Sequence, residues 1–488
     1  MIAIMDKKPF YITTTLPYVN AEAHMGHALE FVRADIIARW KALQGFDVFF
    51  NTGTDEHGQK LFEAAQKEGK DVKAYVDGYS DKFRELLPKL GMSADIHFIR
   101  TTDAKHERAA TEFWKRVQAN GFIYKKAYKT KYCVGCEENK TESELVDGHC
   151  PIHPNRELET IEEENYFFRF SAFGDRLLAY YDKARGEGRT FVVPEFRENE
   201  MREFIKRGLE DFSISRLKSR MSWGVSVPGD ADHVMYVWFD ALTSYISTLG
   251  WPDNAEAFDR FWKDGTPTQY CGKDNTRFQS VMWQAMLLAA DLPNTHTVVV
   301  NGFITGEGGV KMSKSLGNVV NPLEIINEYG TEALRYFLAR EVGSFEDSPF
   351  TIERFKASYN SGLANGIGNL VSRVMRMATT NLDAAVEITA DTIPQEFTDA
   401  LNAFDIQAAT NIIWRHISDA DQVIQDKAPF KLVKTDRAAA QEIIKDLIIR
   451  IHVIGHMLSP ILPETSKAVK DLAKGNKMPE TPLFLRKD

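Results

Sequence analysis

The sequence predicts an α/β protein in which a doubly wound parallel sheet is split by an insert and followed by an α-helical bundle. Three observations lead to this fold class. Apolar, β-branched strand patterns alternate with helical patterns over residues 10–119 and again over residues 225–320. A cluster of cysteine and histidine residues interrupts that alternation between residues 116 and 224. From residue 351 onwards the pattern is helical, with no strand signal.

The size and composition of the chain are those of a globular protein with more than one domain. Its 488 residues exceed the usual size of one domain, and 43% of them are hydrophobic. No apolar run is long enough to span a membrane, and the N-terminal segment lacks the features of a secretory signal. We therefore expect a cytoplasmic protein with no membrane partner. The net charge of −9 argues against a globally basic nucleic-acid binder but not against a local patch that binds RNA.

The first expected strand, Phe10–Leu16, leads through a loop into a helix that we expect to begin near Gly26. His24, Gly26 and His27 therefore lie at a helix N-terminus, where backbone N–H groups and the positive end of the helix dipole suit a nucleotide phosphate. Two imidazoles can donate hydrogen bonds to phosphate oxygens. Considered alone, two histidines with this spacing are more often ordinary surface residues than ligands.

The second expected strand, Asp47–Asn51, is followed by Asp55 at its carboxyl end. Ligands of open parallel sheets bind at this edge, and an ionised carboxylate there can pair with a substrate ammonium group. An N-cap for a helix that begins near Gln59 explains Asp55 equally well. Helical patterns then continue to about Leu90 and again to about Ala119.

Three of the four cysteines form a candidate metal site with one histidine. Cys133, Cys136, Cys150 and His153 have the spacing C-x2-C-x13-C-x2-H, which is typical of tetrahedral zinc held by two knuckles. Four protein ligands leave no open coordination position, so we expect one structural zinc ion per chain. The remaining cysteine, Cys271, is expected to be a buried thiol at the end of a strand.

The sheet pattern resumes after residue 225, with strands expected at Val234–Phe239, Thr268–Cys271 and Thr297–Phe303. The segment Leu323–Arg340 is expected to be helical. Beyond it, helical periodicity and the placement of prolines predict a bundle with helices at Phe355–Met377, Phe397–Val423, Ala438–Met457 and Ser466–Ala473.

A glycine-rich loop, GEGGVKMSKSLGN, carries Lys311 and Lys314. Two lysines three residues apart in a mobile loop can neutralise charge that develops on a polyphosphate. Composition alone is equally consistent with a solvated basic loop.

The combination of HMGH after the first strand with KMSKS near residue 311 resembles the class I aminoacyl-tRNA synthetases. Four further stretches resemble the methionyl-tRNA synthetases: TTTLPYVNAEAHMGHA, NTGTDEHGQK, SISRLKSRMSWGVSVPGD and YVWFDALTSYIS. The resemblance covers essentially the whole chain. It implies a Rossmann-type catalytic domain in two halves (1–115 and 225–320), a connective zinc insert (116–224), a stem-contact linker (321–350) and an anticodon-binding bundle (351–488).

The resemblance also implies an activity, which is the ATP-dependent ligation of L-methionine to tRNA through a methionyl-adenylate. A carboxylate attacks the α-phosphorus of ATP, so catalysis is mainly positioning and charge neutralisation. The implied catalytic residues are His24, His27, Lys311 and Lys314. The implied ATP-binding set adds Gly26, Gly272 and Asp274, with Mg2+ accompanying ATP.

A thioether offers no strong hydrogen bond, so methionine must be selected by shape and by sulfur–aromatic contact. The resemblance implies a pocket of nine residues, with Asp55 at the amino group: Leu16, Tyr18, Asp55, Trp238, Ala241, Leu242, Tyr245, Phe278 and Gln279. Two of them depart from the family pattern. Leu242 stands in place of a common proline, and Gln279 in place of a histidine, which leaves open how the polar wall of the pocket is built.

For tRNA, the resemblance implies that the bundle reads a CAU anticodon. Asn369 and Arg373 lie one helical turn apart in the stretch GNLVSR, and Phe430 stands in KAPF where the family usually has tryptophan. An Asn–Arg pair that merely keeps the bundle surface polar is the alternative. The absence of a C-terminal oligonucleotide-binding extension favours a monomer.

Two other functions remain open from the sequence. A class I synthetase of the cysteinyl type shares both signatures, but it would hold zinc in the amino-acid pocket rather than in the insert. A catalytically inactive, tRNA-binding paralogue is the second, although the intact HMGH and KMSKS argue against it. The enzymes for leucine, isoleucine and valine carry larger editing inserts than this chain has room for.

Overall fold

The computed structural model describes residues 7–136, 138–140, 144–310, 320–388 and 393–487. The chain divides into two compact units, each built from segments far apart in the sequence. The first unit comprises Met1–Ala23, Gly45–Leu86 and Ala94–Val300. The second comprises His24–Gln44, Leu87–Ser93 and Asn301–Asp488. The helix that follows the first strand therefore belongs to a different unit from the strand itself.

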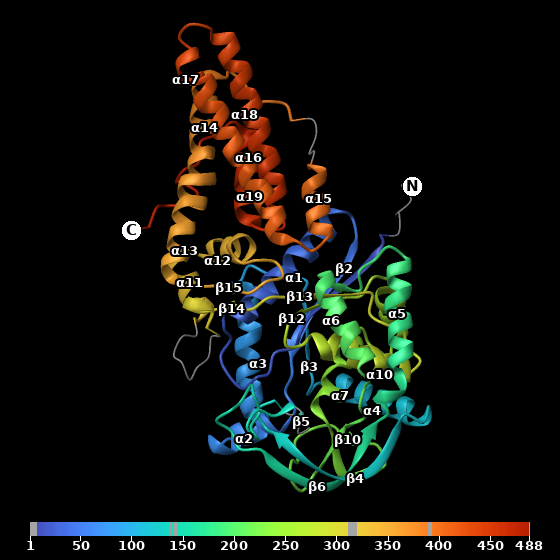
Figure 1. Cartoon of the computed structure of the whole chain (residues 1–488). Helices are drawn as coiled ribbons and strands as arrows, with labels where there is room; N and C mark the ends of the chain where they lie inside the picture. Colours follow the sequence, from blue (N-terminus) through green and yellow to red (C-terminus); the bar gives the residue numbers. More distant parts are fainter. Residues whose placement is uncertain (1–6, 137, 141–143, 311–319, 389–392, 488) are drawn as a thin grey trace. The chain divides into compact units, whose positions relative to one another are not determined.

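The first unit is built on a six-stranded sheet (Figure 1) whose strand order is β3 (His97–Arg100), β2 (Asp47–Thr54), β1 (Pro9–Thr14), β12 (Thr268–Gly272), β13 (Thr297–Asn301) and β7 (Val192–Val193). The pairings of β1 with β2 and β12, of β2 with β3 and of β13 with β7 are parallel. Strand order reverses between β1 and β12, and open α/β sheets bind ligands at such a point, outside the carboxyl ends of the strands. The predicted doubly wound sheet and four of its strands are confirmed.

The expected strand Val234–Phe239 is wrong in its second half. Strand β11 (Asp230–Met235) ends early, and helix α7 (Val237–Ala241) follows at once. The carbonyl of Tyr236 accepts the amides of Phe239 and Asp240, so the apolar run turns into a helix. A short apolar run does not by itself distinguish a buried strand from a buried helix.

The insert and the residues that follow it form two smaller sheets. Strand β11, which was expected to resume the main sheet, belongs to the second of them. One has the order β5 (Glu138–Lys140), β4 (Ile123–Cys133), β6 (Glu159–Phe168) and β8 (Phe212–Ser213), and β4 and β6 pair antiparallel over most of their length. The other is formed by β10 (Ser226–Val227), β11 and β9 (Ser215–Leu217). The helices of the first unit are α2 (Gln59–Lys67), α3 (Val72–Lys89, whose last turn belongs to the second unit), α4 (Ala104–Ala119), α5 (Gly174–Gly186), α6 (Glu195–Lys206), α7, α8 (Ser244–Ser247), α9 (Ala255–Ala257) and α10 (Trp283–Ala289).

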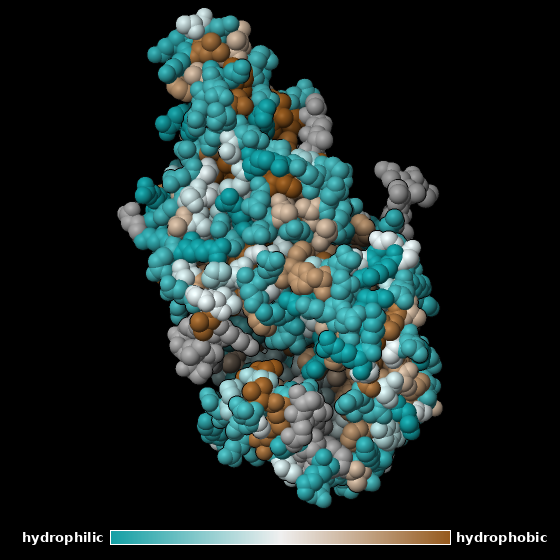
Figure 2. Space-filling view, in the orientation of Figure 1, coloured by the Kyte–Doolittle hydropathy of each residue, from teal (hydrophilic) through white to brown (hydrophobic). Residues whose placement is uncertain are grey.

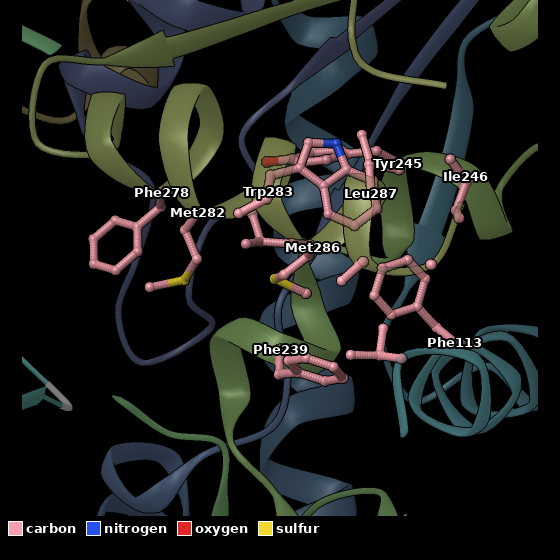
Figure 3. Packing of buried hydrophobic residues seen from close by; sticks show 14 of the residues in the cluster. Phe113, Phe239, Tyr245, Ile246, Phe278, Met282, Trp283, Met286 and Leu287 are labelled. Carbon is pink, nitrogen blue, oxygen red and sulfur yellow. The ribbon is translucent and has the colours of Figure 1, made fainter. Parts of the chain in front are cut away.

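Aromatic side chains fill the core of the first unit (Figure 3), where α4 packs against α7, α8 and α10. Trp283 and Phe113 are buried and stack with their ring centroids 5.6 Å apart. Tyr245 and Phe239 pack edge-on against this pair, and Phe278, Met282 and Met286 belong to the same cluster. Because this core is rigid and dry, the side chains at its edge that face the carboxyl ends of the strands are held in fixed positions.

Among its described residues, the second unit is helical apart from the short parallel pair of β14 (Ile304–Thr305) with β15 (Ser348–Pro349). It contains α1 (Met25–Leu43), α11 (Pro322–Tyr329), α12 (Thr331–Tyr336) and α13 (Ile352–Ser358), with π-helical turns η7 (Phe337–Glu341) and η8 (Tyr359–Gly368). The bundle proper is α14 (Asn369–Asn381), α15 (Gln395–Asn402), α16 (Ile406–Lys427), α17 (Pro429–Leu432), α18 (Arg437–Leu458) and α19 (Pro463–Gly475) (Figure 1). The predicted helical bundle is confirmed, and among the described residues no helix is both long and apolar enough to cross a membrane.

The single helix expected over Phe397–Val423 is instead two helices, α15 and α16. Phe404 has a φ of 61°, in the left-handed region that breaks a helix. Asp405 then caps α16, because its Oδ1 accepts the amide of Ala408 at 3.0 Å. Apolar periodicity continues across this break, which is why the sequence pattern hides it.

Candidate functional site

The two histidines of HMGH cap the helix that they begin. The Nδ1 of His24 accepts the amide of Gly26 at 3.0 Å, and the Nδ1 of His27 accepts the amide of His24 at 3.1 Å. The two rings stack with their centroids 3.8 Å apart. A Cβ at Gly26 would lie 2.9 Å from Cε1 of His24, so only glycine lets this imidazole lie over the backbone.

This capping fixes where the imidazole protons are. Because each Nδ1 accepts a backbone N–H, each neutral ring carries its proton on Nε2 and can donate from that atom. Burial, together with the neighbouring His24, holds the pKa of His27 well below its usual value. His27 is therefore neutral at pH 7, so its ring can act as a hydrogen-bond donor but not as a cation.

Two buried arginines fix helix α1 inside the second unit. Arg33 donates to the backbone carbonyls of Val342, Gly343 and Ser344 at 2.7–3.0 Å, at the end of η7. Arg335 of α12 pairs with Asp35 of α1 at 2.8 Å, and neither side chain is exposed. Arg335 also donates to the carbonyls of Leu90, Pro460 and Ile461, so its guanidinium joins four segments of the unit.

Two strand ends bring Tyr18 and Asp55 together in the first unit. The amide of Asp55 donates to the carbonyl of Pro17 at 3.0 Å, and Tyr18 and Asp55 form a parallel bridge beyond the ends of β1 and β2. Asp55 does not cap the helix α2, whose N-cap position is Gly58 and has no side-chain cap. The structure therefore excludes the alternative explanation of Asp55 as an N-cap.

The aromatic residues expected at the methionine pocket lie on α7, α8 and the π-helical turn η4 (Phe278–Met282). The rings of Trp238 and Phe278 stack with centroids 4.0 Å apart and planes within 6°. Ala241, Leu242 and Tyr245 are buried in the same segment. Tyr245 is held by its carbonyl, which accepts the hydroxyl of Tyr11 at 2.8 Å.

Gln279 is the centre of a buried chain of neutral groups. Its Nε2 donates to the Thr15 hydroxyl at 2.8 Å, and its Oε1 accepts from Gln269 at 3.2 Å. The chain continues from Gln269 through the hydroxyl of Thr295 to Gln284. Gln279 is 1% exposed, and its amide is bonded on both sides by neutral groups.

A second buried network was not expected from the sequence. Oδ2 of Asp240 lies 2.6 Å from Nδ1 of His57, and Oδ1 lies 2.7 Å from Nε2 of His106. Glu56, next to His57, receives both Nε and Nη2 of Arg100 at 2.7–2.8 Å. The only sequence signal for this network was that Glu56 and His57 stand in NTGTDEHGQK and Asp240 in YVWFDALTSYIS, two of the stretches that carry the family resemblance. Arg100 and His106 lie outside the quoted stretches.

These contacts link four segments of the first unit in a closed circuit. Segment 15–18 joins segment 278–279 through Thr15 and Gln279, and Phe278 stacks on Trp238 of α7. Helix α7 joins segment 55–57 through Asp240, and Asp55 returns the circuit to residue 18. Every expected methionine-pocket residue except Tyr245 lies on or beside this circuit.

The residues expected to bind the nucleotide are divided between the units. Gly272 ends β12, and Asp274 follows in a turn closed by the amide of Asn275 on the Gly272 carbonyl at 3.0 Å. This turn lies at the carboxyl edge of the first unit's sheet, whereas His24 and His27 belong to the second unit. Lys311 and Lys314 lie outside the residues that the structure describes.

The four expected metal ligands form one cluster at the insert. The candidate ligand atoms of Cys133, Cys136, Cys150 and His153 all lie within 4.8 Å of one another. The Cys136 and Cys150 sulfurs are 3.5 Å apart, close to the roughly 3.8 Å expected for two thiolates on a tetrahedral zinc. A Cβ at Gly135 would lie 2.6 Å from Cγ of His153, so this knuckle requires glycine. The donor set and its spacing fit zinc.

The three anticodon candidates lie in the helical bundle. Asn369 begins α14, and Arg373 pairs with Asp421 of α16 at 2.7 Å. Phe430 lies on α17 and is 48% exposed, at an end of the bundle where Figure 2 shows hydrophobic atoms within a mostly hydrophilic surface. The Phe430 ring is thus half-exposed, with Nζ of Lys431 5.9 Å from its centroid, whereas Arg373 has an ionic partner within the bundle.

Comparison with known proteins identifies the family. The family model described as tRNA synthetases class I (M) matches residues 10–375. The methionine–tRNA ligase of Caldanaerobacter subterraneus subsp. tengcongensis is 42% identical over 477 residues, which cover 94% of this chain and 73% of that one. The chain belongs to the methionyl-tRNA synthetase family.

Other members of the methionyl-tRNA synthetase family agree in sequence and in fold. The Thermotoga maritima methionine–tRNA ligase is 37% identical over 478 residues, which cover 94% of this chain and 74% of that one. The Mycobacterium tuberculosis methionyl-tRNA synthetase solved in complex with methionyl-adenylate matches with a TM-score of 0.89 and 36% identity, over 98% of this chain and 100% of that one. The predicted family and fold class are thereby confirmed.

Proposed function

We propose that the chain is an enzyme that joins methionine to tRNA through a methionyl-adenylate. The observation that carries this proposal is the match, over nearly the full length of both chains, to a synthetase solved with methionyl-adenylate. The circuit of segments 15–18, 55–57, 238–242 and 278–279 supports it from within the chain, because it surrounds the strand ends where an open α/β sheet takes its ligand.

In the first step the methionine carboxylate attacks the α-phosphorus of ATP, and pyrophosphate leaves. His24 and His27 donate from Nε2 to phosphate oxygens, and the dipole of α1 adds positive potential at the same place. Lys311 and Lys314 hold the departing pyrophosphate, and Mg2+ enters with ATP. Gly272 and Asp274 bind the ribose, because a glycine allows close approach and a carboxylate accepts hydroxyl protons.

Methionine is held at both of its ends. Asp55 pairs with the ammonium group, and Tyr18 lies beside it. The side chain enters between Leu16, Ala241, Leu242, Tyr245 and the Trp238–Phe278 pair, where aromatic rings offer favourable contacts to the thioether sulfur. Gln279 supports this wall in place of the family's histidine. Its amide does not titrate near neutral pH, so the polarity of the wall is independent of pH.

The outer parts of the chain place the tRNA. The zinc knuckle at Cys133, Cys136, Cys150 and His153 stiffens the insert (116–224), which carries the acceptor end to the catalytic halves (1–115 and 225–320). The linker (321–350) contacts the stem, and the bundle (351–488) reads the CAU anticodon through Asn369, Arg373 and Phe430. The enzyme acts as a cytoplasmic monomer.

Methionine-dependent exchange of pyrophosphate into ATP tests the proposal. Exchange with methionine but not with cysteine supports it. Exchange with cysteine alone would establish the cysteinyl type, and the absence of exchange with any amino acid, in protein that still binds tRNA, would establish an inactive paralogue. Metal analysis of protein purified without added metal should give one zinc per chain.

The anticodon role of Phe430 has its own test. Replacing Phe430 by alanine should weaken the use of tRNA in aminoacylation by about 1–3 kcal/mol, the worth of one base–aromatic stack, and leave pyrophosphate exchange unchanged. Phe430→Trp, which restores a ring, is the matched control and should retain aminoacylation. Equal losses in both assays for Phe430→Ala would contradict the anticodon role.

A further inference from the structure

One link of the circuit, that between α7 and segment 55–57, consists of ionisable groups. Asp240 lies on α7 between Trp238 and Ala241, and its carboxylate is hydrogen-bonded to His57. His57 stands two residues after Asp55 in the chain. Asp240, His57 and His106 are each no more than 3% exposed, so water has little access to the link.

We infer that Asp240 is a positioning residue for the ammonium-binding carboxylate of Asp55, acting through His57. This inference rests on the proposed function, because it takes Asp55 as the partner of the methionine ammonium group. It names a residue that does not touch substrate and explains how the turn at residues 55–57 keeps its geometry.

The hydrogen bonds of Asp240 leave it a single arrangement. A carboxylate can only accept, so both Nδ1 of His57 and Nε2 of His106 carry the protons that face it. The remaining ring nitrogen of His106 lies 3.0 Å from the hydroxyl of Ser247 on α8. The carboxylate is thus held from α4 and α8 on one side and directs His57 on the other.

Other contacts hold Asp55 and Glu56 in the turn at residues 55–57, so the hydrogen bond between His57 and Asp240 fixes the remaining residue. Glu56 is anchored by Arg100, and its carbonyl accepts Nε1 of Trp223 at 2.6 Å. The Trp223 ring packs edge-on against His57 with centroids 5.6 Å apart. Asp55 is paired through its backbone with residues 17 and 19. Releasing His57 therefore frees the downstream end of the turn and the direction of the Asp55 side chain with it.

The electrostatics of the pair agree with this role. Burial raises the pKa of Asp240, but the facing histidines outweigh burial and bring it to about 2, so the group is ionised at neutral pH. Burial lowers the pKa of His57, and the Asp240 carboxylate outweighs that effect and raises it. A charge-assisted bond holds an imidazole in a more sharply defined direction than a neutral one.

The test compares methionine with 4-(methylthio)butanoate, which has the same thioether and carboxylate but lacks the ammonium group. Affinities of both compounds are measured by calorimetry for the wild type, for the isosteric variant Asp240→Asn and for Asp253→Asn as a surface control. In Asp240→Asn the preference for methionine over the analogue should fall about tenfold, the size of one charge-assisted hydrogen bond. Asp253→Asn should keep the wild-type preference.

A pair of variants at His57 makes the same test if Asp240→Asn does not fold, as judged by thermal unfolding. His57→Leu removes the donor and should lose the preference, whereas the amide of His57→Gln can still donate to Asp240 and should retain most of it. An unchanged preference, whatever happens to the individual affinities, would mean that Asp240 serves the fold alone and would overturn the inference. If the wild type itself binds no methionine, the proposed function fails instead.

Discussion

Two buried polar networks of the first unit flank the residues that we assign to methionine, and they differ in kind. The Gln279 network is neutral, and it runs from Thr15 through amides and hydroxyls to Gln284. The Asp240 network contains a carboxylate that pairs with His57 and His106. Removing one residue of the neutral network costs only the free energy of its hydrogen bonds. Removing a partner of Asp240 costs more, because it leaves a buried charge without compensation.

The comparison predicts that truncation at Asp240 has the largest effect. Asp240→Ala leaves His57 and His106 without their common acceptor and removes the charge that balances the buried imidazoles. We expect a loss of about 3–5 kcal/mol in the free energy of unfolding, as for other broken buried pairs. Urea unfolding followed by tryptophan fluorescence measures it. A loss as small as that of a surface substitution would show that the network is not closed in solution.

Truncation of the neutral network should cost less. Gln279→Leu keeps a similar volume but leaves the Gln269 amide and the Thr15 hydroxyl without their partner. We expect a loss of about 1–3 kcal/mol in unfolding free energy, the range for an unsatisfied buried polar group. The same urea experiment compares this loss with that of Asp240→Ala, and it includes Gln279→Glu as a variant that adds charge to the neutral network. If Gln279→Leu lost more unfolding free energy than Asp240→Ala, the neutral network would be the more important one for stability, contrary to this prediction.

The pH dependence of stability separates the two networks further. The raised pKa of His57 means that its pairing stabilises the fold fully below the unfolded-state value of about 6.5 and is lost as pH rises through the folded-state pKa. Charged groups that act on His57 are Asp240, Glu56 and Glu107. The stability gap between the wild type and His57→Gln should therefore shrink from pH 6 to pH 9.

For the carboxylate the direction is opposite. The pKa of Asp240 is depressed, so its contribution is present above the unfolded-state value of about 3.9 and is lost as pH falls towards about 2. The gap between the wild type and Gln279→Leu should stay constant over the same range. Unfolding curves at several pH values measure the stability difference between the wild type and each of His57→Gln and Gln279→Leu. A difference that changes with pH for Gln279→Leu would contradict the neutral role of Gln279.

The sequence carried enough information for the architecture because its main strands are runs of β-branched and apolar residues. Strands β3 and β7 were missed because four and two residues are too few to show a period. The break at Phe404 was missed because a left-handed backbone angle in a phenylalanine leaves no compositional trace. Apolar periodicity thus predicts which elements exist more reliably than where each one ends.

At the site, prediction worked where the chemistry lies in consecutive residues. Cys133, Cys136, Cys150 and His153 were predicted as a metal site from their spacing, and their ligand atoms lie within 4.8 Å of one another. The phosphate-binding role predicted for HMGH stays a prediction. The Asp240 network could not be predicted in this way, because His57 and Asp240 are 183 residues apart and His106 and Asp240 are 134 apart. Such pairs become visible only when the fold brings one loop and two helices together.

The placement of α1 in the second unit has a consequence for how the chain is made. Arg33 leaves the ribosome early, but the Ser344 carbonyl that receives it is 311 residues further along the chain. At about 5–20 residues per second, the arginine waits roughly 15–60 s for that partner. Asp35 waits in the same way for Arg335. The helix that carries the two signature histidines is therefore among the first segments to be synthesised, but its buried Arg33 and Asp35 gain these partners only after residues 335–344 have been made.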